Sequence, residues 1–136
     1  MRYVIIGNSI AAVGCIEGIR SVDKMGEIVV VSKEPHPVYS RPLISYLLCG
    51  KTDREKMKYR ADDFYQKNSV QVLYGTSAEK IEEKDHTVVL DDGEKIAYDK
   101  LLLATGSSPF VPPMDGLDTV RDASTFMSLD DALALE

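Results

Sequence analysis

Apolar residues near the N-terminus form two short continuous runs, separated by a segment with helical periodicity. The first run, at residues 3–6, ends at Gly7, and small and apolar residues then recur at helical spacing over residues 9–20. The second run occupies residues 28–31. Continuous rather than alternating hydrophobicity indicates strands buried on both faces, as in a parallel sheet. The pattern predicts a βαβ unit, whose crossover is right-handed in nearly all known proteins.

The middle of the chain predicts two helices and a third strand. Residues 34–60 are rich in Pro, His, Tyr, Arg and Lys, with a helix expected from near Pro42 to Gly50. Another helix is expected over residues 61–68, ahead of a short strand at residues 70–74.

The hydrophobic period changes to two after Gly75. Turn signals then separate three short strands, at residues 77–81, 87–90 and 95–98. They predict a three-stranded antiparallel meander inserted between parallel elements. A continuous apolar strand follows at residues 100–104, and the only later helical signal is residues 128–135, with Ser128 as its N-cap. The predicted fold class is α/β, with a parallel sheet and this meander.

The amino-acid composition argues against nucleic acid and membranes as partners. The 136 residues are 44% hydrophobic and 28% charged, which fits one soluble globular domain. Sixteen Lys and Arg against 22 Asp and Glu give a net charge of −6, the wrong sign for binding nucleic acid or an anionic membrane. No apolar run approaches the ~20 residues of a membrane span, and no signal peptide is recognisable. We therefore expect a cytoplasmic protein with neither partner.

The two cysteines, Cys15 and Cys49, carry no recognisable chemistry. They form no CxxC or CxxxxC motif and have no companion histidine pair, so neither a zinc site nor a redox-active dithiol is predicted. Two reduced thiols are favoured over a structural disulfide.

The first strand leads into a turn of small residues that matches the dinucleotide fingerprint GxGxxG/A, with serine in place of the middle glycine. The segment reads Gly7-Asn8-Ser9-Ile10-Ala11-Ala12. Gly7 permits the sharp turn, Ser9 lets the backbone approach a diphosphate, and Ala12 allows close packing of helix on strand. The helix N-terminus would then offer free N–H groups to the phosphates. Such small residues also serve plain packing.

An acidic residue, Glu34, follows the second strand, where the fingerprint places a carboxylate that binds a ribose. Lys33 beside it is a further candidate contact. The alternative for Glu34 is a solvated loop carboxylate.

Three further segments, taken with the glycine turn, resemble a known family. They are PVYSRPL at residues 37–43, GTSA at residues 75–78 and YDKLLLATGS at residues 98–107. Together with the meander, they are similar to the FAD-dependent pyridine nucleotide oxidoreductases with two dinucleotide-binding domains. The resemblance covers residues 1–113 and is strongest to nitrite reductase large subunits and to rubredoxin and ferredoxin reductases.

The resemblance implies FAD as cofactor and assigns further site residues. Arg41 and Pro42 would lie at the flavin end, the main chain of Ala78 at the adenine, and Ala104, Thr105 and Gly106 close to the cofactor. Alternatively, Arg41 caps a helix C-terminus and Thr105–Gly106 is an ordinary turn. Three aromatic residues are expected to pack rather than to stack on flavin: Tyr39, Tyr46 and Phe64.

Departures from the family narrow the chemistry. Disulfide-reducing members have a CxxxxC motif on their first long helix, and others have a single cysteine where this chain has Pro42. Tyr46 stands where some ferredoxin reductases have a lysine, so no flavin contact is assigned to it. We expect no thiol chemistry, no catalytic residue and no metal site.

The resemblance also implies a domain plan. Residues 1–113 would be the N-terminal part of a discontinuous FAD domain lacking its last strand, and residues 114–136 an exit linker and short helix towards an absent nicotinamide domain. The closing Leu135–Glu136 matches a common expression-tag junction, which favours a shortened chain over a natural split protein. An incomplete sheet would favour a homodimer or poor FAD retention, and the piece alone would be inactive.

The function implied is that of a flavoprotein oxidoreductase carrying electrons from NAD(P)H through FAD to a redox carrier protein or second redox centre. The alternatives are a stand-alone nucleotide-binding or sensing module and an NADH oxidase.

Overall fold

The computed structural model describes all residues from 1 to 136 and divides into two compact units. The first unit comprises Met1–Val38 and Arg60–Gly106, and the second comprises Tyr39–Tyr59 and Ser107–Glu136. The division into residues 1–113 and 114–136, which concerns the domains of a longer protein, stays a prediction.

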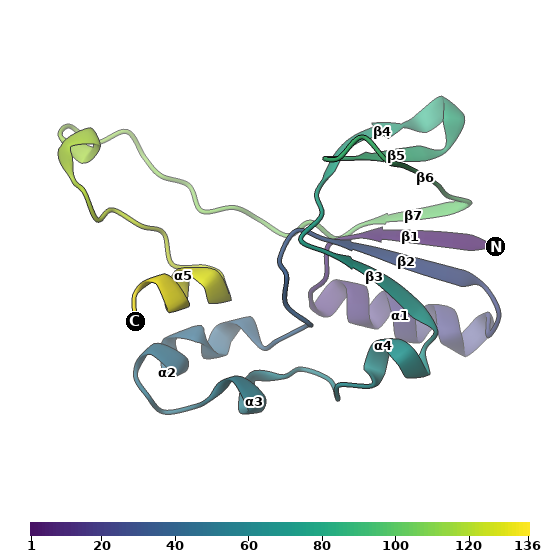
Figure 1. The fold of residues 1–136 in the computed structure, drawn as a ribbon, viewed down its shortest axis with the longest axis horizontal. Coiled ribbons are helices and arrows are strands. Elements are labelled where there is room, and N and C mark those ends of the chain that lie inside the picture. The colour runs from purple at the N-terminus through teal and green to yellow at the C-terminus, as the bar shows by residue number, and fades with distance from the viewer. The chain divides into compact units, whose positions relative to one another are not determined.

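A four-stranded parallel sheet forms the centre of the first unit. Its strand order is β3-β2-β1-β7, and the helix α1 (Ile10–Val22) connects β1 to β2 (Figure 1). The strands are β1 (Arg2–Ile6), β2 (Glu27–Ser32), β3 (Val70–Tyr74) and β7 (Lys100–Leu103). In the register, Val4 of β1 lies between Val29 of β2 and Leu101 of β7. The βαβ unit and the later parallel strands predicted from the apolar runs are confirmed.

The three remaining strands of this unit form an antiparallel sheet in the order β4-β5-β6. They are β4 (Ala78–Glu82), β5 (Thr87–Leu90) and β6 (Lys95–Ala97), with a 3-10 turn at η2 (Glu83–Asp85). The register shifts between Ala78 and Lys80, a bulge that the sequence pattern did not predict. The meander itself is confirmed.

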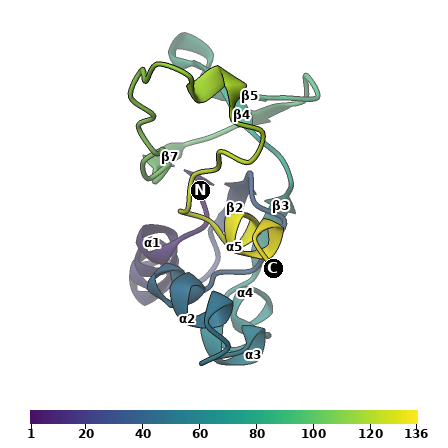
Figure 2. The same ribbon diagram turned by 90° about the vertical axis from the view of Figure 1, so that its left-hand side faces the viewer.

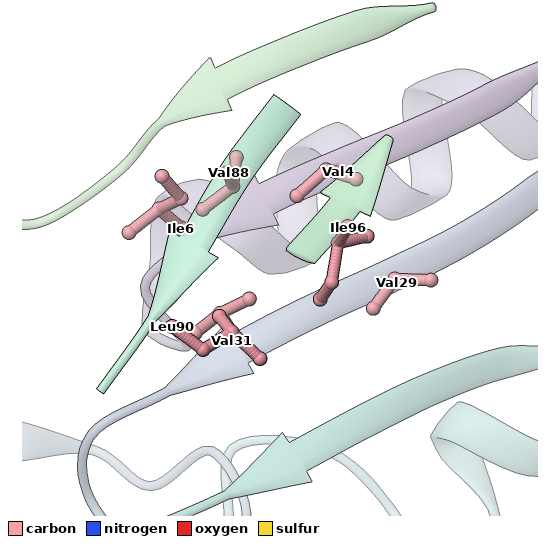
Figure 3. Close-up of a cluster of buried hydrophobic side chains, with 7 residues drawn as sticks. All are labelled: Val4, Ile6, Val29, Val31, Val88, Leu90 and Ile96. Carbon is pink, nitrogen blue, oxygen red and sulfur yellow. The ribbon is translucent and has the colours of Figure 1, made fainter. Parts of the chain in front are cut away.

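Side chains from the meander and from one face of the parallel sheet pack into one cluster. Figure 3 shows its seven buried members, Val4, Ile6, Val29, Val31, Val88, Leu90 and Ile96. The helix α1 covers the opposite face of the sheet (Figure 2). Its residues Ala12, Val13 and Ile16 are buried. Meander, parallel sheet and helix therefore make three layers, as the fold class predicted.

The short helix α4 (Phe64–Lys67) also belongs to this unit and is shorter than the helix expected over residues 61–68. Residues 61–63 instead form a turn, in which the Phe64 N–H donates to the Ala61 carbonyl at 3.0 Å.

The second unit consists of short helices. They are η1 (Arg41–Leu43), α2 (Ile44–Leu48), α3 (Arg54–Met57), η3 (Leu117–Thr119) and α5 (Leu129–Ala134). Ile44, Met57, Leu129 and Ala132 form their buried core. The helices predicted from Pro42 to Gly50 and at residues 128–135 are confirmed, whereas α3 was not predicted. No helix of the chain combines the length and the apolar character that a membrane span requires.

Candidate functional site

Most of the predicted site residues lie where the parallel strands of the first unit end. Gly7 directly follows β1, Lys33 and Glu34 follow β2, and Ala104 follows β7. Because β1, β2 and β7 are parallel and adjacent, these residues share the carboxyl edge of one sheet. Ligands of open α/β sheets bind at this edge.

Gly7 is the point at which two of these turns touch. Its N–H donates to the Val31 carbonyl at 2.8 Å, and its φ of +108° is a conformation that other residues rarely adopt. A Cβ at this position would overlap the carbonyl oxygen of Ala104 and lie 2.7 Å from its carbon. Only glycine therefore lets the turn after β1 lie against the turn after β7.

The N-terminus of α1 is open at its first turn. Ser9 is the N-cap residue, but its side chain makes no capping hydrogen bond, and the first turn contains no acidic residue. The exposed Ala11 adds no bulk, and the buried Ala12 seats the helix on the sheet. Unpaired N–H groups at the positive end of the helix dipole are suited to an anion such as a diphosphate. These residues fit the group that the fingerprint predicted.

The side chain of Asn8 is held by hydrogen bonds from other segments. Its Oδ1 accepts from the Tyr65 hydroxyl at 2.7 Å, and its Nδ2 donates to the His36 carbonyl at 3.5 Å. The sequence did not predict a role for Tyr65, because no sequence pattern around α4 indicates a hydrogen-bond partner in the glycine turn.

The loops after β2 and β3 are joined through Ser32, the one buried polar residue of this unit. Its hydroxyl donates to the Glu34 carbonyl at 2.8 Å, and its carbonyl accepts from the Thr76 N–H at 3.0 Å. Glu34 is half-buried, whereas Lys33 is exposed. Ala78 opens β4 and packs against the meander cluster. Ser32 therefore links the loop that carries Glu34 to the loop that leads into β4, the strand that begins at Ala78.

The turn after β7 is open to solvent. The Ala104 N–H donates to the Ile6 carbonyl at 2.8 Å, which continues the pairing of β7 with β1 beyond the strand. Thr105 and Gly106 are exposed, and Gly106 has a φ of +70°. Backbone groups at this position are therefore accessible next to Gly7.

Arg41 and Pro42 belong to the second unit, where they begin η1. Arg41 donates through Nη1 to the Met127 carbonyl at 3.0 Å, and its guanidinium lies 5.2 Å from the centre of the Tyr39 ring. The Tyr39 hydroxyl accepts from the Leu129 N–H at 2.9 Å. Arg41 thus contacts the segment that leads into α5, and Pro42 is exposed.

Both cysteines are free thiols, Cys15 half-buried and Cys49 exposed. Burial raises the pKa of the Cys15 thiol, which favours its protonated form at neutral pH. The chain contains no group of three or more His, Cys, Asp or Glu side chains that could hold a metal ion.

The sequence model of the pyridine nucleotide-disulphide oxidoreductases matches residues 1–136. The chain belongs to this family. The family resemblance of the sequence is thereby confirmed, and membership supports FAD and NAD(P)H as cofactors.

Individual relatives are oxidoreductases. The chain is 40% identical over 134 residues to the NADH-dependent phenylglyoxylate dehydrogenase subunit epsilon of Aromatoleum evansii, covering 98% of this chain and 32% of that subunit. It is 36% identical over 131 residues to nitrite reductase [NAD(P)H] of Bacillus subtilis, covering 96% and 16%. The chain thus spans a third or less of these proteins' length.

A solved structure shares the fold. Putidaredoxin reductase, in its covalent complex with putidaredoxin, matches with a TM-score of 0.81 and 29% identity, over 98% of this chain and 33% of that one.

Proposed function

We propose that this chain is the N-terminal part of the FAD-binding domain of a flavoprotein that passes electrons from NAD(P)H to a redox carrier protein or a second redox centre. The observation that carries the proposal is the open N-terminus of α1 beside the contact between Gly7 and Ala104, in a chain that the family model matches throughout. Bound FAD would supply the electron-transfer chemistry, and the chain would bind and orient it.

Each site residue of the first unit has a role in this proposal. N–H groups at the start of α1 bind the diphosphate, in a turn formed by Gly7, Asn8, Ser9, Ala11 and Ala12. The Glu34 carboxylate accepts hydrogen bonds from the adenosine ribose beside Lys33, and the Ala78 main chain meets the adenine. Ala104, Thr105 and Gly106 border the flavin. The flavin-side role of Arg41 and Pro42 stays a prediction from the family resemblance.

The names of the relatives support a carrier or a second centre as electron acceptor. One is a subunit of a larger dehydrogenase, one is a nitrite reductase, and one was solved with putidaredoxin attached. A cytoplasmic location is part of the proposal and is supported by the two free thiols. The full protein would be the enzyme, and the activity of the 136 residues alone is expected to be absent.

Titration of the full-length protein with FAD and with NAD⁺ tests this function. FAD should bind with quenched flavin fluorescence and yield yellow protein, and it should bind more tightly than NAD⁺. Folded protein that binds NAD⁺ in preference to FAD would contradict the proposal and favour a nucleotide-sensing module. Rapid reduction of oxygen by the FAD-loaded full protein would instead favour an NADH oxidase, which the lack of a cysteine at Pro42 disfavours.

A further inference from the structure

The hydroxyl of Tyr65 ties together two loops at the carboxyl edge of the parallel sheet. It donates to Asn8 Oδ1 at 2.7 Å and accepts from the Val38 N–H at 3.2 Å. The same Asn8 amide donates through Nδ2 to the His36 carbonyl at 3.5 Å. One phenol therefore fixes the glycine turn after β1 and the loop after β2, although Tyr65 lies 57 positions from Asn8.

The ring of Tyr65 is itself held in place. It meets the Phe64 ring edge-on at 5.2 Å and the Tyr74 ring edge-on at 6.5 Å. Burial raises the pKa of Tyr65, and burial together with Tyr65 raises the pKa of Tyr74 to about 12. Both phenols therefore keep their protons at physiological pH, and Tyr65 remains able to donate to Asn8.

We propose that Tyr65 is a positioning residue for the diphosphate turn. It holds Asn8 and the 36–38 loop in the arrangement that receives the ligand, so that binding does not have to order them. Rigid binding segments gain affinity because less conformational entropy is lost on association. The inference rests on the proposed function, since it needs a dinucleotide at the α1 N-terminus.

Tyr65→Phe in the full chain tests the inference directly. The variant keeps the ring contacts and removes the hydroxyl, so the loss should be specific to ligands that bear a diphosphate. Affinity for FAD and for ADP should fall roughly five- to twentyfold, as expected for one or two hydrogen bonds. Affinity for adenosine, which has no phosphate, should change less than about twofold.

Tyr3→Phe is the matched control. The Tyr3 hydroxyl donates to Asp23 Oδ2 at 3.0 Å, at the amino end of β1 and away from the glycine turn. This variant also loses one tyrosine hydroxyl that fixes a loop. It should lower the melting temperature to a similar extent while FAD affinity stays at the wild-type value.

A double-mutant cycle with Asn8→Ala separates positioning from a general loss of structure. Because Tyr65 acts in part through Asn8, Tyr65→Phe should cost less FAD affinity in the Asn8→Ala background than in the wild type. Fully additive losses would show that Tyr65 and Asn8 act independently and would overturn the inference.

Hydrogen exchange of the wild-type chain gives a readout that needs no variant. The Val38 N–H should be protected from exchange before FAD is added, because it donates to the Tyr65 hydroxyl in the ligand-free chain. Exchange of the Val38 N–H at the rate of an unstructured chain, with protection appearing only when FAD binds, would overturn the inference, and this measurement decides the matter if Tyr65→Phe does not fold.

Two outcomes distinguish a failure of the positioning role from a failure of the proposed function. If the wild type binds FAD and Tyr65→Phe binds it equally well, or loses FAD and adenosine affinity alike, the positioning role is wrong and the proposed function stands. If the folded full-length protein binds no FAD, both are wrong.

Discussion

Glycine is required at position 7 for two separate reasons, one predicted from the sequence and one seen only in the structure. The fingerprint predicted a glycine for the sharp turn, and the structure adds a second requirement, the close approach of the Ala104 carbonyl. The same glycine therefore allows the packing of β7 beside β1, and in the proposed function it also gives a ligand access to α1. Packing and ligand binding can therefore both explain why position 7 is a glycine.

Replacing Gly7 by alanine should damage both stability and binding. The positive φ alone costs about 1–2 kcal/mol for a residue with a Cβ, and the overlap with Ala104 adds to it. We expect the free energy of unfolding, measured in urea, to fall by about 2–4 kcal/mol, with FAD binding lost.

Gly14→Ala is the control for this substitution. Gly14 lies inside α1, and a Cβ there would meet nothing within 4 Å. This variant should be neutral or stabilised by up to about 1 kcal/mol and should bind FAD normally. If Gly7→Ala behaved like Gly14→Ala, the turn would not need glycine for either reason.

At the scale of elements, helix α5 depends on its N-terminal hydrogen bonds. Asp131 accepts from the N–H groups of Ser128 and Met127, and Ser128 accepts from the Asp131 N–H, which makes a capping box. The sequence predicted Ser128 as the cap. It did not predict that Asp131 would complete the box, because an acidic residue in a first turn also fits a simple interaction with the helix dipole.

The pKa of Asp131 gives this helix a defined pH dependence. The backbone hydrogen bonds from Ser128 and Met127 hold the pKa of Asp131 below its ordinary value. The stabilisation is therefore fully present above the unfolded pKa of about 3.9 and is lost as the pH falls through the lower folded value. Exchange protection of α5, corrected for the intrinsic rate, should fall on acidification in the wild type.

Asp131→Asn should remove that pH dependence and lower the protection of α5 at pH 7. Asp130→Asn removes an equal charge from the same turn but leaves the capping box, so it should retain the acid-induced loss. Equal behaviour of the two variants would mean that charge alone, rather than the capping box, stabilises the helix.

How far the sequence predicts an element depends on where its stabilising contacts come from. The strands β1 and β2 are buried on both faces, so their continuous apolar runs identify them directly. The run of β7 is also continuous, although Leu101 and Leu102 are only half-buried and Leu103 is exposed. The helix α3 has only four residues and is held by its N-cap, Asp53, and by the buried side chain of Met57. No periodic pattern can develop over that length, which is why it was missed.

The candidate site was predicted to the extent that its residues follow local motifs. Gly7, Ser9 and Ala12 have fixed spacings, and Glu34 is placed by the end of a strand. Tyr65 reaches Asn8 only through the folding of α4 back to the sheet edge, and no local pattern records that contact. Likewise, the hydrogen bond from Arg41 to the Met127 carbonyl is known only from the structure.

At the scale of the whole molecule, the first unit holds its meander by apolar packing across two sheets. Val88 is fully buried against the parallel sheet, whereas its neighbour Val89 is only half-buried on the other face of β5. Successive residues of β5 thus point to opposite faces of the meander, one towards the core and the next away from it.

Val88→Ala and Val89→Ala form a matched pair. Val88→Ala should lower the free energy of unfolding by about 1.5–3 kcal/mol, because it removes buried methyl groups and leaves a cavity. Val89→Ala should cost less than about 1 kcal/mol. Urea denaturation of both variants measures the difference, and equal costs would contradict the packing of the meander described above.

The central claim is that the N–H groups at the start of α1 bind the diphosphate of FAD. Titration of the ¹⁵N-labelled chain with FAD, followed by backbone amide shifts, tests it most directly. The amides of Gly7 to Ala12 should show the largest shifts, while Met25 and Gly26, in the loop before β2, should not move. Saturable FAD binding without shifts at Gly7 to Ala12 would contradict the account.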